Sequence, residues 1–295
     1  MTKPTLLIIG AAGNNGTATL DALTRKYKND FVIRAGVRSE AKAKALAKTY
    51  PGVQTVVLDL DKRETLPAAF AGVDKLFLII GNVENREEHA KNAIDAAVAA
   101  KSVKHVLFYS VAGAEHEAIL FARQFRAGEK YLEASGLQWT HLRTIFFQEN
   151  FLGWAEGVKQ GGFYFGIRDG RFAALNVGDI GEVAANILAS SGHEGKAYVL
   201  TGPQLMSGDE YAAVFSKVTG SAVKYVSPEP ADTLKSLLEA GWPEWQAKGL
   251  VELFEVFATN QAAVVSPDGE RLLGRPLTSL ADYVRANKAA FVKAA

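Results

Sequence analysis

The chain has 295 residues, of which 48% are hydrophobic and 22% charged, which is typical of one or two globular domains with a sizeable core. Its 33 basic and 32 acidic side chains leave a net charge of +1, so no overall electrostatic attraction favours a nucleic-acid partner. The absence of cysteine excludes disulfides, thiolate metal sites, iron–sulfur clusters and cysteine nucleophiles.

Signals for a membrane or a secretory pathway are weak. No apolar run approaches the roughly 18 residues that a membrane span needs. The apolar residues 6–9, which follow Lys3, are interpreted as a buried strand rather than a signal-peptide core. We therefore expect a cytoplasmic protein with no membrane partner, as a monomer or homodimer.

Short apolar runs alternate with helix-like segments along the first half of the chain. The predicted strands are 5–9, 31–37, 53–58, 75–80, 103–109 and 138–144. The predicted helices are near 15–27, 40–49, 62–70, 86–100 and 118–135. Because continuous apolar strands separated by helices form parallel sheets covered on both faces, the pattern predicts a doubly wound α/β domain.

The second half has a different organisation. From about residue 146, aromatic and glycine residues crowd together, and the chain beyond 204 is mostly helical. A strand at 172–177, a helix at 180–190 and a strand at 196–201 are predicted to rejoin the first sheet. We therefore predict the doubly wound domain over 1–152, with 173–203 rejoining it, and a small, mostly helical substrate lobe over 153–295.

A glycine-rich loop follows the first predicted strand and opens the first helix. It reads Gly10-Ala11-Ala12-Gly13-Asn14-Asn15-Gly16. Glycine permits a tight turn and the close approach of a phosphate, and the following helix N-terminus offers free N–H groups to a pyrophosphate. In its strand–turn–helix context the loop predicts a dinucleotide site, with a purely structural turn as the alternative.

The end of the second strand indicates which dinucleotide. Arg38 stands where an NAD site would place an acid, and Lys42 follows one helical turn later. A guanidinium suits a 2′-phosphate, so NADP(H) is favoured over NAD(H), unless both cations are simply solvated. Asp59, after the third strand, is a candidate at the adenine edge, and Gly81, after the fourth, would let the chain pass close to the cofactor. Turn chemistry explains Asp59 and Gly81 equally well.

The sequence resembles the NmrA-like family of atypical short-chain dehydrogenases over nearly its full length. The resemblance is carried by GAAGNNG at 10–16, Arg38 with Lys42, HVLFYS at 105–110, EKYLEASGLQWTHLRTIFFQEN at 129–150, NVGDIGEVAANIL at 176–188 and YVLTGP at 198–203. It implies a Rossmann domain with a C-terminal substrate lobe. The family includes NADPH-dependent quinone and dye reductases and also non-catalytic sensors of NADP(H).

The resemblance also implies roles for single residues. Gly10, Gly13, Asn15 and Gly16 match the pyrophosphate loop, and Arg38 with Lys42 matches the 2′-phosphate pair. Ser110, after the fifth strand, matches the nicotinamide side. Phe147 matches a loop residue near the nicotinamide and the substrate.

The proton donor of ordinary short-chain dehydrogenases is missing. No tyrosine has a lysine four residues later, and Phe125 stands where relatives carry Lys or His. Hydride transfer to a strong electrophile such as a quinone needs no protein acid, because water supplies the proton. We therefore predict an NADPH-dependent oxidoreductase acting on a small aromatic, quinone-like acceptor. A regulatory NADP(H) sensor, and a reductase or isomerase of a specialised biosynthetic pathway, remain alternatives.

Aromatic side chains offer a wall for a flat acceptor, although packing of the lobe is the alternative. The candidates are Phe146, Phe147, Phe151 and Phe165. The candidate catalytic residues are Ser110, His116 and Phe147. The five histidines are scattered without metal-ligand spacing, so no metal is expected.

Overall fold

The computed structural model describes residues 3–293, which divide into two compact units. The first unit comprises the chain up to Thr144 together with 178–199, and the second comprises 145–177 and the chain from Leu200 onward. The sequence-based proposal placed the boundary after residue 152 and returned 173–203 to the first domain. The chain in fact leaves the first unit earlier and re-enters it over a shorter segment.

The first unit is built on a seven-stranded sheet of order β3-β2-β1-β4-β5-β6-β9. Its strands are β1 (Thr5–Ile9), β2 (Val32–Val37), β3 (Gln54–Val57), β4 (Lys75–Leu78), β5 (His105–Val111), β6 (Gln138–Thr144) and β9 (Lys196–Leu200). Neighbouring strands from β3 through β6 pair in parallel, and the order reverses direction between β1 and β4. Residues 6–9 of β1 are at most 4% exposed, as expected for a strand covered on both faces.

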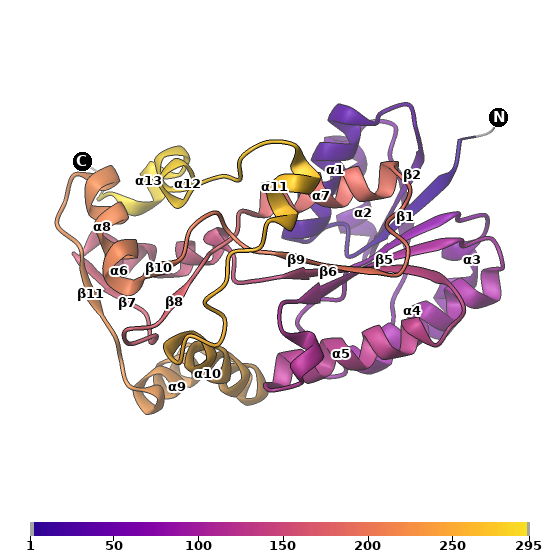
Figure 1. Cartoon of the computed structure of the whole chain (residues 1–295). Coiled ribbons are helices and arrows are strands. Elements are labelled where there is room, and N and C mark those ends of the chain that lie inside the picture. Colours follow the sequence, from indigo (N-terminus) through magenta and orange to yellow (C-terminus); the bar gives the residue numbers. More distant parts are fainter. Residues whose placement is uncertain (1–2, 294–295) are drawn as a thin grey trace. The chain divides into compact units, whose positions relative to one another are not determined.

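Helices cover both faces of this sheet (Figure 1). They are α1 (Asn14–Lys26), α2 (Glu40–Thr49), α3 (Leu66–Phe70), α4 (Arg86–Ala100), α5 (Leu120–Glu133) and α7 (Val177–Ala189), with 3-10 turns η1 (Arg63–Thr65) and η2 (Ala114–His116). The helices α3, α4 and α5 lie on one face, and α1, α2 and α7 lie on the other. The doubly wound α/β fold predicted from the sequence is therefore confirmed.

The second unit has an aromatic core and only short strands. Its strands are β7 (Gly162–Tyr164), β8 (Arg171–Phe172), β10 (Met206–Ser207) and β11 (Lys224–Val226). Its helices are η3 (Gln148–Trp154), α6 (Ala155–Lys159), α8 (Gly208–Thr219), α9 (Pro230–Glu239), α10 (Glu244–Ala258), α11 (Asp268–Leu273), α12 (Leu280–Ala286) and α13 (Lys288–Phe291). A capping box between Ser207 and Glu210 starts α8.

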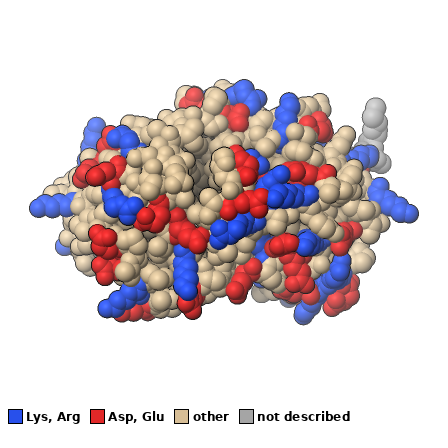
Figure 2. Space-filling model, turned by 60° about the horizontal axis from the view of Figure 1, so that its bottom comes forward, with Lys and Arg blue, Asp and Glu red and all other residues tan. Residues whose placement is uncertain are grey.

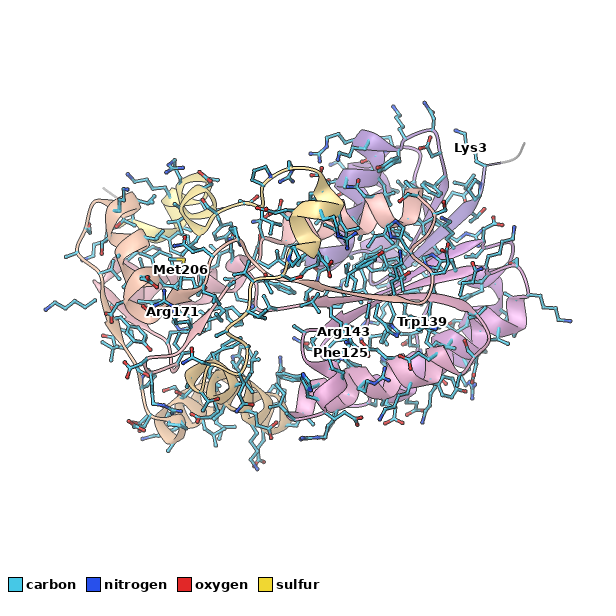
Figure 3. The ribbon with its side chains drawn as sticks, viewed as in Figure 1. Lys3, Phe125, Trp139, Arg143, Arg171 and Met206 are labelled. Carbon is cyan, nitrogen blue, oxygen red and sulfur yellow. The ribbon has the colours of Figure 1, made fainter. Side chains whose placement is uncertain are left out.

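The predicted strand at 172–177 is wrong. Only Arg171 and Phe172 are in a strand, and they pair with Met206 and Ser207 of the second unit rather than with the first sheet (Figure 3). Residues 173–175 are buried without belonging to a named strand, and Val177 begins α7. Gln148 provides hydrogen bonds to two of the buried backbone carbonyl groups of this segment. Its backbone N–H donates to the carbonyl oxygen of Leu175, and its Nε2 donates to the carbonyl oxygen of Ala174.

The surface and the helix lengths bear on partners. On the face of the described chain in Figure 2, basic and acidic side chains are interspersed, and neither sign forms a continuous field. Such a face gives no electrostatic footprint for nucleic acid. Among residues 3–293, no helix is both long and apolar enough to cross a membrane.

Candidate functional site

The glycine loop forms a tight cradle between β1 and α1. Gly10 has φ +77°, and a Cβ there would lie 2.5 Å from the carbonyl oxygen of Ile79. A Cβ on Gly16 would lie 2.4 Å from the carbonyl oxygen of Gly10. Gly13 is the N-cap of α1, and its N–H donates to that same Gly10 oxygen at 3.0 Å. No side chain fits at positions 10 and 16, so the loop leaves backbone surface open to a ligand.

The start of α1 has the features of an anion site. No side chain caps it, and its first turn holds no acidic residue. Gly13 and Asn14 are exposed, whereas Asn15 is 8% exposed and its Oδ1 has no hydrogen-bond partner. Free N–H groups, the positive end of the helix dipole and an orphaned buried acceptor together fit a phosphate-bearing ligand with hydroxyl groups.

Two cations follow β2. Arg38 comes directly after Val37 and is exposed, and Lys42 lies in the first turn of α2, where its N–H donates to the capping hydroxyl of Ser39 at 3.3 Å. Neither Arg38 nor Lys42 forms an ion pair within residues 3–293. Their charges are therefore available to an anionic group at the carboxyl end of β2.

Asp59 and Gly81 have ordinary local roles. The carboxylate of Asp59 accepts from the N–H of Asp61 at 3.2 Å, and the N–H of Asp59 donates to the Thr65 hydroxyl at 3.0 Å. Asp59 thus stabilises its own turn. A Cβ on Gly81 would meet no atom within 4 Å, so its surroundings do not require glycine.

Ser110 lies near the end of β5 and is fully buried. The carboxylate of Glu129, on α5, is close enough for Ser110 to help lower its pKa, but no hydrogen bond of good geometry joins the two side chains. A hydroxyl without exposed surface does not meet a ligand in this conformation. His116, by contrast, is exposed in the turn η2.

A cluster of charged side chains surrounds Arg143, which lies near the end of β6 (Figure 3). Arg143 donates two hydrogen bonds to Glu129 and pairs with Glu115 at 2.8 Å, and Arg126 pairs with Glu129 and Glu133. Burial raises the pKa of Glu129, but the hydrogen bonds and charge of Arg143, together with His141 and Ser110, hold that pKa below its ordinary value.

This cluster also contains an arrangement of possible metal ligands. Oxygen and nitrogen atoms of Glu129, Glu133 and His141 lie within 4.8 Å of one another. Both glutamates already bind Arg126 or Arg143, so a cation at this place would have to displace a guanidinium group.

The aromatic residues of the second unit form a packed core. Phe151 and Phe165 have no exposed surface, because other rings surround them at centroid distances of 4.6 to 6.4 Å. Their predicted role in lining a substrate pocket is therefore corrected to core packing. Phe146 is 7% exposed and packs against six rings of the same core, and Phe147 is half-buried with its backbone bridged to Leu175.

Sequence reasoning missed Arg86. It opens α4 directly after the loop that follows β4, and it is 1% exposed. An arginine at the first position of a helix opposes the helix dipole, and this placement was the signal in the sequence.

The chain belongs to the NmrA-like family, whose model matches residues 2–278. It is 33% identical over 288 residues to an NAD(P)H azoreductase of Xenophilus azovorans, covering 97% of this chain and 99% of that protein. It is 31% identical over 281 residues to quinone oxidoreductase 2 of Escherichia coli, covering 95% and 97%. The resemblance inferred from the sequence is confirmed.

Solved structures agree with this assignment. The NADPH complex of the Escherichia coli quinone oxidoreductase matches with a TM-score of 0.89 and 31% identity, covering 96% of this chain and all of that one. The NADP(H) complex of Citrobacter triphenylmethane reductase matches with a TM-score of 0.87 and 28% identity, covering 96% and 99%. The transcriptional regulator NmrA, at 18% identity and a TM-score of 0.78, shares the fold.

Proposed function

We propose that this protein, an NAD(P)H-dependent oxidoreductase, uses NADP(H) to reduce a small conjugated acceptor such as a quinone, with water as the proton source. The observation that supports it most strongly is the juxtaposition of the glycine cradle with two unpaired cations, Arg38 and Lys42, at the carboxyl ends of β1 and β2. In doubly wound sheets these strand ends are where dinucleotides bind.

The residues divide between the parts of the cofactor. Backbone N–H groups of the loop from Gly10 to Gly16 would hold the pyrophosphate, assisted by the exposed Asn14 and the buried amide of Asn15. Arg38 and Lys42 would hold the 2′-phosphate, and the chain at Asp59 and Gly81 would border the cofactor. When bound, the reduced dinucleotide supplies a hydride.

The side chains near the carboxyl end of β5 support transfer without a protein acid. Tyr109 is buried, its hydroxyl is hydrogen-bonded to Thr144 Oγ1 at 2.5 Å, and burial raises its pKa. Phe125, on α5, packs against Tyr109 at a ring distance of 6.3 Å and has no proton to give. Water is therefore the better source of the proton that the reduced acceptor takes up.

The acceptor class follows from its relatives and from Phe147. The full-length relatives above 30% identity reduce azo compounds and quinones, which accept hydride without prior protonation. Phe147, which is half-buried and follows Phe146 in the chain, is the side chain that we assign to the acceptor side.

Steady-state oxidation of NADPH in the presence of a 1,4-benzoquinone, a 1,4-naphthoquinone and an azo dye tests the proposal. We expect turnover of at least one quinone, with NADH a poorer donor than NADPH. A protein that binds NADPH but reduces none of these acceptors would contradict the proposed reaction and favour a role in sensing the cofactor.

A further inference from the structure

The guanidinium of Arg86 is buried in the first unit without a carboxylate to balance its charge. Its nitrogens donate to the carbonyl oxygen of Gly81 at 3.3 Å, to Asn82 Oδ1 at 3.0 Å and to Gln124 Oε1. The Nε has no partner. No Asp or Glu within residues 3–293 lies within ion-pair distance of it.

Two features make this an unfavourable place for a cation. Burial lowers the pKa of Arg86 to about 10. The side chain also belongs to the first residue of α4, at the positive end of the helix dipole. The partial compensation comes from aromatic faces, with Cζ 4.2 Å from the centre of the Phe125 ring and 5.9 Å from that of Phe121. A hydrophobic side chain of similar volume would serve stability at least as well.

The charge borders the crevice where the cofactor is proposed to bind. Arg86 holds the loop that follows β4, through the Gly81 oxygen, and it interacts electrostatically with Tyr109 on β5. Burial raises the pKa of Tyr109, and the side chains of Thr144 and of Asn15, which lies in the first turn of α1 beside the glycine loop, oppose that rise. These contacts place the charge at the carboxyl ends of β4 and β5, beside the reversal of strand order between β1 and β4.

We propose that Arg86 determines acceptor specificity: its buried positive charge favours acceptors that are neutral before hydride transfer and anionic after it, and disfavours acceptors that are cations. This inference rests on the proposed function. It names quinones and azo compounds as the favoured class and cationic triphenylmethane dyes as the disfavoured one.

The charges of the two reactions explain the difference. A neutral quinone that receives a hydride gains one bond to hydrogen and two electrons, becomes a hydroquinone monoanion, and then takes a proton from water. A cationic dye that receives a hydride on its central carbon becomes neutral and takes up no proton. In a poorly solvated site a fixed cation stabilises the first product and repels the second substrate. The same charge disfavours the cationic ring of NADP⁺ relative to neutral NADPH.

The test compares kcat/KM for an uncharged quinone and a cationic triphenylmethane dye in the natural protein, Arg86→Met and Arg86→Lys. We expect the natural protein to prefer the quinone, Arg86→Met to lose about tenfold of that preference, and Arg86→Lys to retain most of it. Arg34→Met is the matched control, because Arg34 also donates to backbone carbonyls, those of Ala69 and Ala71, but lies on β2.

A binding measurement complements the kinetics. The ratio of the Kd for NADP⁺ to the Kd for NADPH, obtained by titration, should exceed one in the natural protein and fall several-fold in Arg86→Met. If the natural protein reduces the dye as efficiently as the quinone, or if folded Arg86→Met keeps the preference, the inference is overturned. If Arg86→Met does not fold, the natural protein and Arg86→Lys decide between these outcomes.

A different set of results would contradict the proposed function rather than the role of Arg86. If the natural protein binds NADPH but reduces no acceptor, the proposed reaction is wrong, and the ratio of the two Kd values alone then tests the charge. Equal affinities for NADP⁺ and NADPH would show that Arg86 does not act on the bound ring.

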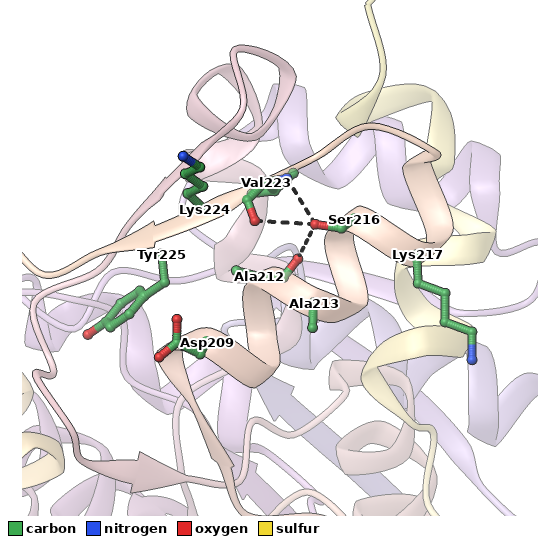
Figure 4. A pocket seen from close by; sticks show the side chains of 8 residues that line it. All are labelled: Asp209, Ala212, Ala213, Ser216, Lys217, Val223, Lys224 and Tyr225. Atoms are coloured by element: carbon green, nitrogen blue, oxygen red, sulfur yellow. Dashed lines mark hydrogen bonds between the residues drawn. The ribbon is translucent and has the colours of Figure 1, made fainter.

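The second unit contains a pocket of its own. A pocket of about 750 Å³ lies between α8 and β11 in the second unit, with Asp209, Lys217, Lys224 and Tyr225 around it (Figure 4). One acidic and two basic side chains surround a floor of small residues, and these charges select no ligand class.

Discussion

Arg143 donates two hydrogen bonds to Glu129, at 2.9 and 2.7 Å, and the carboxylate that receives them is fully buried. The pair joins β6 to α5, and Arg143 is the register partner of Ser110 on the neighbouring strand β5. Because a buried carboxylate that loses its partner keeps its desolvation penalty, this pair controls stability more than most ion pairs of the chain.

We expect Arg143→Met to lower the free energy of unfolding by about 3 kcal/mol, measured by urea denaturation. Arg168→Met is the matched control, because Arg168 makes an equally well-formed pair with Glu255, at 2.8 Å, but both side chains are about 40% exposed. Its loss should cost less than about 1 kcal/mol. Equal losses in the two variants would show that burial does not set the strength of the first pair.

His105 should make the protein less stable in mild acid. Burial, assisted by the charge of Lys75, lowers the pKa of His105 to about 4 in the folded state, from an ordinary value of 6.5. Between about pH 4 and pH 6.5, the unfolded chain therefore binds a proton at His105 that the folded chain does not bind. The free energy of unfolding should fall as the pH drops from about 6.5 to about 4, by at most about 3 kcal/mol from this group.

Two measurements check this expectation. The imidazole resonances of His105 should stay those of a neutral ring down to about pH 5 in NMR titrations. His105→Gln keeps a group able to bond to the Thr140 hydroxyl, which His105 contacts at 2.8 Å, and should flatten the pH dependence. A variant as acid-sensitive as the natural protein would assign the loss to other groups.

The glycines of the cradle should differ sharply from Gly81 in their tolerance of a methyl group. Gly10→Ala and Gly16→Ala force Cβ atoms to within 2.5 Å of carbonyl oxygens, so both should weaken NADPH binding and lower the Tm by several degrees. Gly81→Ala meets open space and should leave the Tm nearly unchanged. Calorimetry would measure the Tm values, and titration would measure NADPH binding. A Gly16→Ala variant with unchanged Tm and unchanged NADPH affinity would contradict the cradle geometry.

Arg38 should separate the two dinucleotides. Arg38→Ala removes a charged contact to a 2′-phosphate, so NADPH affinity should fall by about 1.5–3 kcal/mol while NADH affinity stays nearly unchanged. Lys48→Ala, an exposed cation in the last turn of α2, is the control and should leave both affinities unaltered. Parallel losses for NADPH and NADH in Arg38→Ala would refute the assignment.

Alanine substitutions of Phe165 and Phe147 should affect different properties, stability in the first case and the KM for the acceptor in the second. Phe165 is fully buried among rings, so Phe165→Ala should cost about 3–5 kcal/mol of stability. Phe147→Ala removes a half-buried ring and should change KM for the acceptor more than the Tm. Chemical denaturation beside quinone kinetics separates the two effects. A stable Phe165→Ala variant with altered KM would return that residue to the acceptor site.

The sequence by itself determined the doubly wound sheet, the glycine cradle and the position of the two free cations. These features are local: β1, the loop and α1 are contiguous, and Arg38 follows its strand directly, so periodicity and glycine spacing specify them. The ends of β1 and β6 were predicted to the residue, because turn residues such as Gly10 and Gly136 lie next to these strands.

Only the tertiary structure decided which side chains are covered and which charges are paired. Ser110 and Phe165 are buried by residues distant in the chain. Phe172 likewise pairs with Met206 of β10 and not with the first sheet, and the local sequence does not specify that partner. Arg86 is the clearest case. Its sequence neighbours Glu87 and Glu88 suggest a solvated helix start, yet packing against Phe125 encloses its charge, because desolvation is a property of the assembled surroundings and not of the local sequence.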